Sequence, residues 1–133
     1  MKSFTKAVPV LGKEEFVRFA SVVGDFNPIH YDRDFAQAFI LKLPGVVAQG
    51  PLVLLLALDA LASEGCLPQS GSVRARIIGP VFADMVIVFE AKDDGCFQLV
   101  GNGKAVLTGS ISEPRPERLA ISIDPRAMGS VAD

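Results

Sequence analysis

The chain has 133 residues, half of them hydrophobic and 21% charged, which is the composition of one globular domain and not of a disordered segment. The formal net charge of −2 and the absence of a basic run argue against a nucleic-acid binder. The longest apolar run, residues 51–61, is shorter than the roughly 20 residues of a membrane span, and Asp59 interrupts it. We therefore expect no contact with nucleic acid or membrane.

The first 70 residues predict mainly helices, after a short first strand within residues 5–10. Residues 13–23 carry apolar side chains at i, i+3, i+4 and i+7, the spacing of an amphipathic helix. Gly24 is a natural C-terminal stop for this helix. A further helical turn is expected at residues 34–39, followed by a turn at residues 43–45.

A second, longer helix is predicted over residues 51–63. Gly50 suits the cap position and Pro51 the first helical position. The helix is apolar nearly all round, so other elements have to surround it.

The chain after residue 70 predicts strands, at residues 72–78, 85–91, 96–100 and 104–111. Asp94-Gly95 and Asn102-Gly103 are strong signals for two-residue hairpins, so these strands form an antiparallel sheet. A curved sheet wrapped around the long helix gives the apolar helix its cover, in a single α+β domain over residues 1–133. In the tail, residues 113–133, an alternating apolar pattern could add an edge strand; it consists of Leu119, Ile121 and Ile123.

The two cysteines, Cys66 and Cys96, are isolated, without a CxxC motif or a neighbouring histidine. No signal peptide is recognisable. Both are therefore expected to be free thiols in a reducing cytoplasm and to act as small core hydrophobes. A catalytic thiol is less favoured, because a reactive thiolate needs a base beside it.

The only histidine, His30, lies five residues after Asp25 in the stretch VVGDFNPIHYDRDFA. Asn27-Pro28 makes a rigid turn, so the carboxylate and the imidazole can project towards one point and share a water as base and acid. The helix start at Gly50 offers free N–H groups that suit a developing oxyanion. Together these groups describe water addition across an α,β-unsaturated thioester.

The same residues could serve other purposes. A structural histidine is the plain alternative. A calcium loop beginning at Asp25 fails, because its fifth and sixth positions are Ile29 and His30. A zinc site fails because there is no second histidine or nearby cysteine. Asp32 and Asp34 are expected on a solvated face.

The segment GDFNPIHYDRDFA resembles the hydratase signature of the MaoC-like (R)-specific enoyl-CoA hydratases, which have the hot-dog fold. Residues 44–52, PGVVAQGPL, look like the family's PG…HGM segment, and residues 75–92 resemble its strand–turn–strand. The resemblance covers roughly residues 10–112 and implies a hot-dog domain whose central helix is residues 51–63.

The resemblance also implies roles for individual residues. Asp25 would activate water for attack at C3, and His30 would orient that water and deliver a proton to C2. The Gly50 amide would hold the thioester oxygen, and Asn27 would fix the loop. No metal or redox cofactor is implied, since coenzyme A or an acyl carrier is part of the substrate.

Three positions depart from the family pattern: Val23 replaces serine or threonine, Gln49 replaces histidine, and Pro51 replaces methionine. They leave the catalytic pair intact and bear on the acyl pocket, where the Gln49 side chain could orient the acyl group. Arg74, Arg76 and Lys104 could contact the phosphates of coenzyme A, or could simply be solvated.

The expected function is (R)-specific hydration of trans-2-enoyl thioesters to (R)-3-hydroxyacyl thioesters, or the reverse dehydration, in fatty acid metabolism. Unpaired sheet edges indicate a homodimer or larger oligomer, with a hetero-oligomer also open. One rival is a hot-dog thioesterase, which usually lacks this histidine loop. Another is an acyl-binding subunit of a hetero-oligomeric dehydratase, against which the intact Asp25 and His30 argue.

Overall fold

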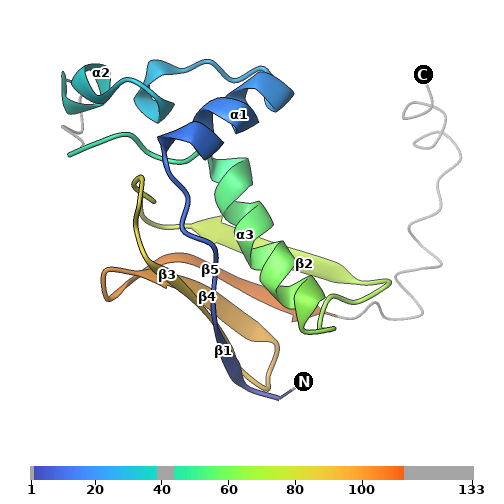
Figure 1. Cartoon of the computed structure of the whole chain (residues 1–133). Helices are drawn as coiled ribbons and strands as arrows, with labels where there is room; N and C mark the ends of the chain where they lie inside the picture. The colour runs from blue at the N-terminus through green and yellow to red at the C-terminus, as the bar shows by residue number, and fades with distance from the viewer. Residues whose placement is uncertain (1, 39–43, 113–133) are drawn as a thin grey trace, which may run out of the picture.

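The computed structural model describes residues 2–38 and 44–112, and an antiparallel sheet and one long helix dominate it (Figure 1). The helical elements are α1 (Lys13–Val23), the 3-10 turn η1 (Pro28–His30), α2 (Arg33–Ala38) and α3 (Gly50–Ser63). The strands are β1 (Phe4–Ala7), β2 (Ser72–Ile77), β3 (Ile87–Ala91), β4 (Cys96–Gly101) and β5 (Lys104–Ser112).

The described strands form one antiparallel sheet in the order β1-β3-β4-β5-β2. The two-residue hairpin predicted at Asn102-Gly103 is present between β4 and β5. A hairpin also joins β3 to β4 at Asp94-Gly95, but its loop is one residue longer than predicted, because the Lys92 N–H pairs with the Cys96 carbonyl and the Gly95 N–H bonds back to the Lys92 carbonyl. Asn102 and Gly103 have φ values of 52° and 75°, the left-handed conformation that a type I′ turn requires at both positions. Strands β1 and β2 are the two edges.

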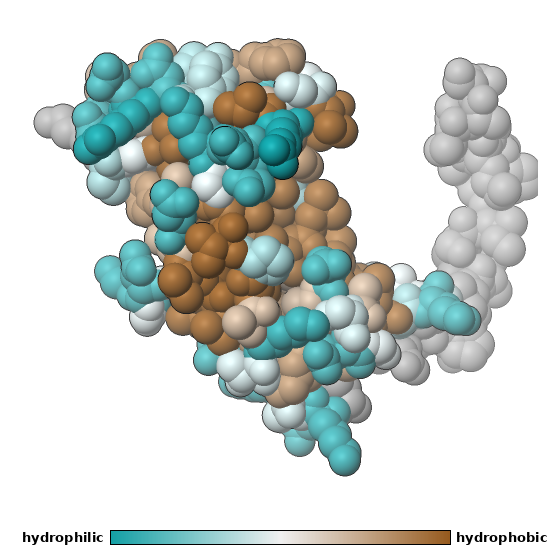
Figure 2. All heavy atoms as spheres, viewed as in Figure 1, coloured by the Kyte–Doolittle hydropathy of each residue, from teal (hydrophilic) through white to brown (hydrophobic). Residues whose placement is uncertain are grey.

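The core forms where α3 lies across the concave face of the sheet (Figure 1). Strand residues alternate between this face and the outside, so β3 buries every second side chain. The Phe89 and Phe97 rings stack with centroids 5.6 Å apart. The predicted sheet around a long helix is therefore confirmed. Cover is partial, because hydrophobic surface stays exposed over α3, including Leu55 (Figure 2).

Several boundaries differ from the predicted ones. Helix α3 begins at Gly50, with Gln49 as its N-cap, so placing Gly50 at the cap was wrong by one residue. Strand β3 begins two residues later than predicted, because Asp84 has a φ of 64° and the Met85 N–H bonds back to the Phe82 carbonyl. These contacts make a turn where the sequence suggested strand.

The free-thiol prediction for Cys66 and Cys96 is confirmed, and Cys66 packs against the core, but the assignment of Cys96 to the core was wrong. Cys96 is exposed, because it follows the hairpin turn at the start of β4, and Cys66 is only half-buried. The predicted tail strand at 119–123, the end of the helical turn at residue 39 and the start of the turn at residue 43 lie outside the described residues.

Candidate active site

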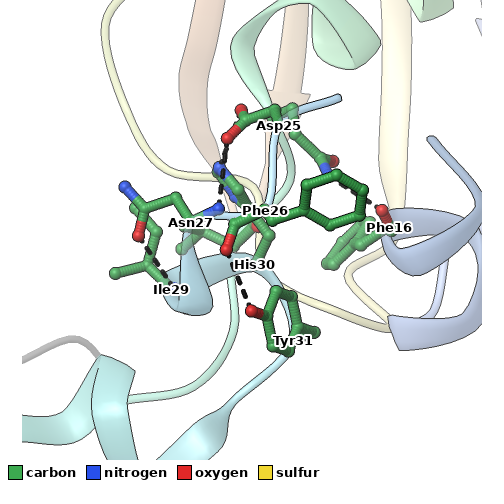
Figure 3. A network of polar contacts seen from close by, with 9 residues as sticks. Phe16, Asp25, Phe26, Asn27, Ile29, His30 and Tyr31 are labelled. Carbon is green, nitrogen blue, oxygen red and sulfur yellow. Dashed lines mark hydrogen bonds and ion pairs between the residues drawn. The ribbon is translucent and has the colours of Figure 1, made fainter. Parts of the chain in front are cut away.

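The loop after α1 is shaped by side chains that accept backbone N–H groups two residues ahead. Gly24 ends α1 with a φ of 73°, donating its N–H to the Ala20 carbonyl. Asp25 Oδ1 then accepts the Asn27 N–H at 3.2 Å, and Asn27 Oδ1 accepts the Ile29 N–H at 3.2 Å (Figure 3). Asn27 therefore helps to fix the shape of this loop, while a contact between Asn27 and substrate stays a prediction.

Tyr31 closes this loop from the other side. Its hydroxyl donates to the Phe26 carbonyl at 2.9 Å (Figure 3). This hydrogen bond joins the two ends of the turn that separates Asp25 from His30, so it restricts the relative position of their side chains. This contact could not be predicted from the sequence, because a tyrosine that bonds to a backbone carbonyl has no motif.

His30 and Asp25 point towards one another, with His30 Nε2 3.4 Å from Asp25 Oδ2 (Figure 3). The imidazole side chain is only 9% exposed. Its other nitrogen, Nδ1, lies 2.8 Å from the Val47 carbonyl oxygen. A carbonyl only accepts, so Nδ1 carries a proton and, in the neutral ring, Nε2 presents its lone pair to the Asp25 side.

Solvent reaches the pair from the side of Asp25, whose side chain is 44% exposed. A separation of 3.4 Å exceeds that of an ordinary N–H···O bond. A carboxylate oxygen and an imidazole lone pair at this separation can each accept a hydrogen bond from the same water molecule, one from each of its O–H bonds.

Val47 joins the His30 turn to the start of α3. Its N–H donates to the Ile29 carbonyl at 3.1 Å, and its own carbonyl accepts from His30. The same segment is bound to residues 81–82, through the Ala48 N–H and a bridge between Val47 and Phe82. Since Val47 and Gly50 are three residues apart, their Cα atoms lie no more than about 11 Å apart. The long-range contact between residues 30 and 47 could not be read from the sequence.

Gly50 is the first residue of α3, and within the described residues its N–H meets no acceptor. Pro51 follows and has no N–H of its own. A Cβ at Gly50 would lie 3.1 Å from Cδ1 of Ile77 on β2, so the space beside the Gly50 Cα is tight. An unpaired donor at the positive end of a 14-residue helix suits an anionic oxygen.

Gln49 lies beside Gly50 but faces inward. It is 1% exposed, and its Nε2 donates to the Phe16 carbonyl of α1 at 2.8 Å. Its Oε1 is buried and has no hydrogen-bond partner among the described residues. Contact between Gln49 and an acyl group stays a prediction.

The basic residues divide into two groups. Arg74 and Arg76 pair in register with Ser110 and Thr108, and the four residues line a shallow hollow of about 330 Å³ on β2 and β5. Neither arginine has an ion-pair partner within residues 2–38 and 44–112. Lys104 lies at the other end of β5, six residues from Ser110, which is about 20 Å along a strand.

Two further searches cover the described residues only. They contain no cluster of three or more histidine, cysteine, aspartate or glutamate side chains that could hold a metal. None of their helices combines the length and the apolar character that a membrane span needs.

The family model for the MaoC-like domain matches residues 2–113. The chain belongs to this family. The resemblance seen in GDFNPIH is thus confirmed, and the loop of Asp25 and His30 is part of a MaoC-like domain. A comparison with curated proteins finds none that matches.

Solved structures share the fold of this MaoC-like chain. R-hydratase PhaJ1 from Pseudomonas aeruginosa is 24% identical, with 82% of this chain and 75% of that chain covered and a TM-score of 0.60. The (R)-hydratase from A. caviae, involved in PHA biosynthesis, is 19% identical over 85% and 95% of the two chains, with a TM-score of 0.66. A chain of the ChsH1-ChsH2 complex from Mycobacterium tuberculosis is 17% identical, with 84% of this chain and 91% of that chain covered and a TM-score of 0.60. The hot-dog fold is therefore confirmed.

Proposed function

We propose that this MaoC-like domain hydrates trans-2-enoyl thioesters to (R)-3-hydroxyacyl thioesters, or catalyses the reverse dehydration. The observation that carries the proposal is the pairing of Asp25 with a buried His30 whose tautomer is fixed by the Val47 carbonyl. A solvated carboxylate facing a fixed, water-shielded imidazole is an arrangement for moving a proton rather than for packing.

Asp25 and His30 hold one water in this mechanism. Each accepts one of its hydrogens, so a lone pair of the water oxygen is directed at C3 of the enoyl group. As the O–C3 bond forms, one water proton passes to the pair, and the pair returns a proton to C2 on the same face. Because Val47 holds the Nδ1 proton, His30 can deliver to C2 only a proton that Nε2 has first taken up.

The electrons of the C2–C3 double bond pass to the thioester oxygen during water attack, so negative charge develops there. The unpaired Gly50 N–H at the start of α3 would stabilise this enolate-like oxygen. Collapse of the enolate with protonation at C2 completes the addition of one water molecule. The reaction is redox-neutral, so it needs no redox cofactor. Because the Gly50 N–H would hold the developing charge, we propose that the reaction uses no metal either.

The carrier of the acyl group is coenzyme A or an acyl carrier. Arg74 and Arg76 are the basic residues that support a phosphate contact, because they share a hollow with two hydroxyl side chains. Lys104 lies outside this hollow, four residues along β5 from Thr108, which is about 13 Å, so its contact would be a separate one.

We also propose that two copies of the chain associate. Exposed apolar side chains lie on α3, where Leu55 is 49% exposed, and at the end of the edge strand β2, where Ile77 and Ile78 are 46% and 52% exposed. An edge strand with apolar neighbours favours pairing with a second strand. Light scattering at micromolar concentration should give at least twice the 14.1 kDa mass of one chain; a 14.1 kDa particle would contradict the pairing.

The function is tested with crotonyl-, octenoyl-, mesaconyl- and bulky enoyl-thioesters, following the loss of enoyl absorbance. We expect turnover of at least one of them, an (R) product by chiral analysis, and no effect of EDTA. An (S) product or reversible inactivation by EDTA would contradict the mechanism. Release of free thiol from a saturated acyl thioester would show a thioesterase instead.

A further inference from the structure

Gln49 is a buried polar side chain that the fold does not need. Its Nε2 donates to the Phe16 carbonyl, which as part of α1 already accepts a helical N–H from Ala20. Its Oε1 is buried without a donor among the described residues, which destabilises a folded protein. An apolar side chain of similar size would remove that penalty and leave the Phe16 carbonyl paired within α1.

The position of Gln49 suggests what the side chain does. The peptide unit between Gln49 and Gly50 is planar, so it holds the Gln49 carbonyl and the Gly50 N–H in one rigid group. The carbonyl end of this group accepts the Val53 N–H at 3.1 Å, inside α3. The side chain of the same residue is bound to α1 at 2.8 Å. Two attachments therefore set the direction of the Gly50 N–H.

The hydrogen bond from Gln49 to α1 also links the Gly50 amide to the element that precedes Asp25. Phe16 is fully buried, and α1 runs from it to Gly24, immediately before Asp25. A shift of α3 relative to α1 would move the Gly50 amide relative to the Asp25 carboxylate. The Gln49–Phe16 bond opposes that shift.

We propose that Gln49 is a positioning residue, which aims the Gly50 N–H at the thioester oxygen by anchoring its peptide plane to α1. The inference rests on the proposed hydration for its catalytic consequence. It differs from a substrate-contact role, because the amide nitrogen is already bound to the Phe16 carbonyl and the side chain is 1% exposed. A half-paired buried amide is then retained for the geometry of the site, not for stability.

The first test needs no substrate. Gln49→Met keeps the size of the side chain and removes its amide. Gln98→Met is the control on β4, where the half-buried Gln98 donates its Nε2 to Glu90 Oε2 of β3. We expect ¹⁵N relaxation to show a more mobile Gly50 amide in Gln49→Met than in Gln98→Met, with thermal midpoints no lower than wild type for Gln49→Met. An unchanged Gly50 amide, or a Gln49→Met variant that fails to fold, would overturn the proposal.

The second test is kinetic. We expect Gln49→Met to lower kcat about tenfold, with KM changed less than about threefold and the pH profile of kcat unchanged. Gln49→His, which keeps an N–H for the Phe16 carbonyl, should recover most of the loss and restore the ordered Gly50 amide. Equal kcat values for wild type and Gln49→Met would overturn the positioning role. If the wild-type protein hydrates no enoyl thioester, the proposed function fails, while the relaxation measurement still decides whether Gln49 orders Gly50.

Discussion

Two turns of this molecule use the same local device for different ends. In the loop after α1, Asp25 Oδ1 accepts the backbone N–H of Asn27 at 3.2 Å. In the hairpin between β3 and β4, Asp94 Oδ1 accepts the backbone N–H of Cys96 at 2.9 Å. Both bonds bend the chain over two residues and both were foreseeable from the sequence, because aspartate before a turn commonly does this.

The difference lies in what each carboxylate meets next. The Asp94 carboxyl is next to the exposed Cys96 thiol, and its hydrogen bond and charge raise the pKa of that thiol. Cys96 is therefore kept in its unreactive thiol form. Asp25 faces a buried imidazole that Val47, seventeen residues further along the chain, holds in place. Each turn is therefore formed by residues next to one another in the chain, whereas the pairing of Asp25 with His30 also depends on the contact between His30 and Val47.

Removing one member of the reactive pair should have the largest effect. Asp25→Asn and His30→Ala should each lower kcat by about 10²–10⁴, the usual range for a positioned acid or base. Asp94→Asn makes the same chemical change in the other turn and should leave kcat unchanged. Steady-state kinetics on the best enoyl thioester measures all three. Near-wild-type turnover in a folded Asp25→Asn or His30→Ala would refute the pairing.

Two backbone amides differ in the same way. The Cys96 N–H in the hairpin donates to Asp94, whereas the Gly50 N–H at the start of α3 has no acceptor within the described chain. Gly50→Pro deletes this donor and should lower kcat by about 10²–10³. Proline is tolerated at the first helical position, and Gln49 already has the extended backbone, φ −63° and ψ 143°, that a following proline favours. A folded variant with more than half of wild-type kcat would place the oxyanion contact elsewhere.

Gly50→Ala sharpens the same point, because it keeps the N–H and adds a methyl group. That methyl would lie 3.1 Å from Ile77 Cδ1, so we expect a higher KM and little change in kcat. Ile77→Val removes this Cδ1 atom and should restore KM in the double variant. Failure of Ile77→Val to help would mean that the methyl obstructs the substrate rather than Ile77.

A smaller effect is expected on the sheet surface. Arg74→Gln and Arg76→Gln should each raise KM for a coenzyme A thioester about two- to fivefold, as exposed charge contacts do. A short thioester without phosphates is the control and should show no change. Equal losses with both substrates would argue against a phosphate contact.

The smallest effect belongs to the hairpin turn. The Cys96 backbone N–H holds the pKa of the Asp94 carboxyl below its ordinary value. A carboxyl whose pKa is lower in the folded chain adds stability above its unfolded pKa and loses it as pH falls through the folded pKa. Asp94→Asn should therefore lower the thermal midpoint slightly at neutral pH, and the difference should vanish in acid. A difference that grew in acid would have the wrong sign.

The sequence predicted what depends on neighbours along the chain. Helix α1 was correct at both ends, because its apolar spacing and Gly24 are local signals, and the turn residues located both hairpins. The pairing of Asp25 with His30 was proposed from the motif. The Val47 and Phe16 carbonyls that orient His30 and Gln49 were missed, because a backbone acceptor is the same in every residue type. Their roles follow only once the fold brings residues 30 and 47, and 16 and 49, together.

The sharing of one water by Asp25 and His30 is tested most directly by a double-mutant cycle on kcat. The variants are Asp25→Asn, His30→Ala and the two combined, measured in proteins whose folding is checked by thermal unfolding. If both residues act on the same water, the double variant should be no worse than the more damaging single variant by more than about threefold. Losses that multiply would show that the two residues act on separate steps and would contradict the shared-water mechanism.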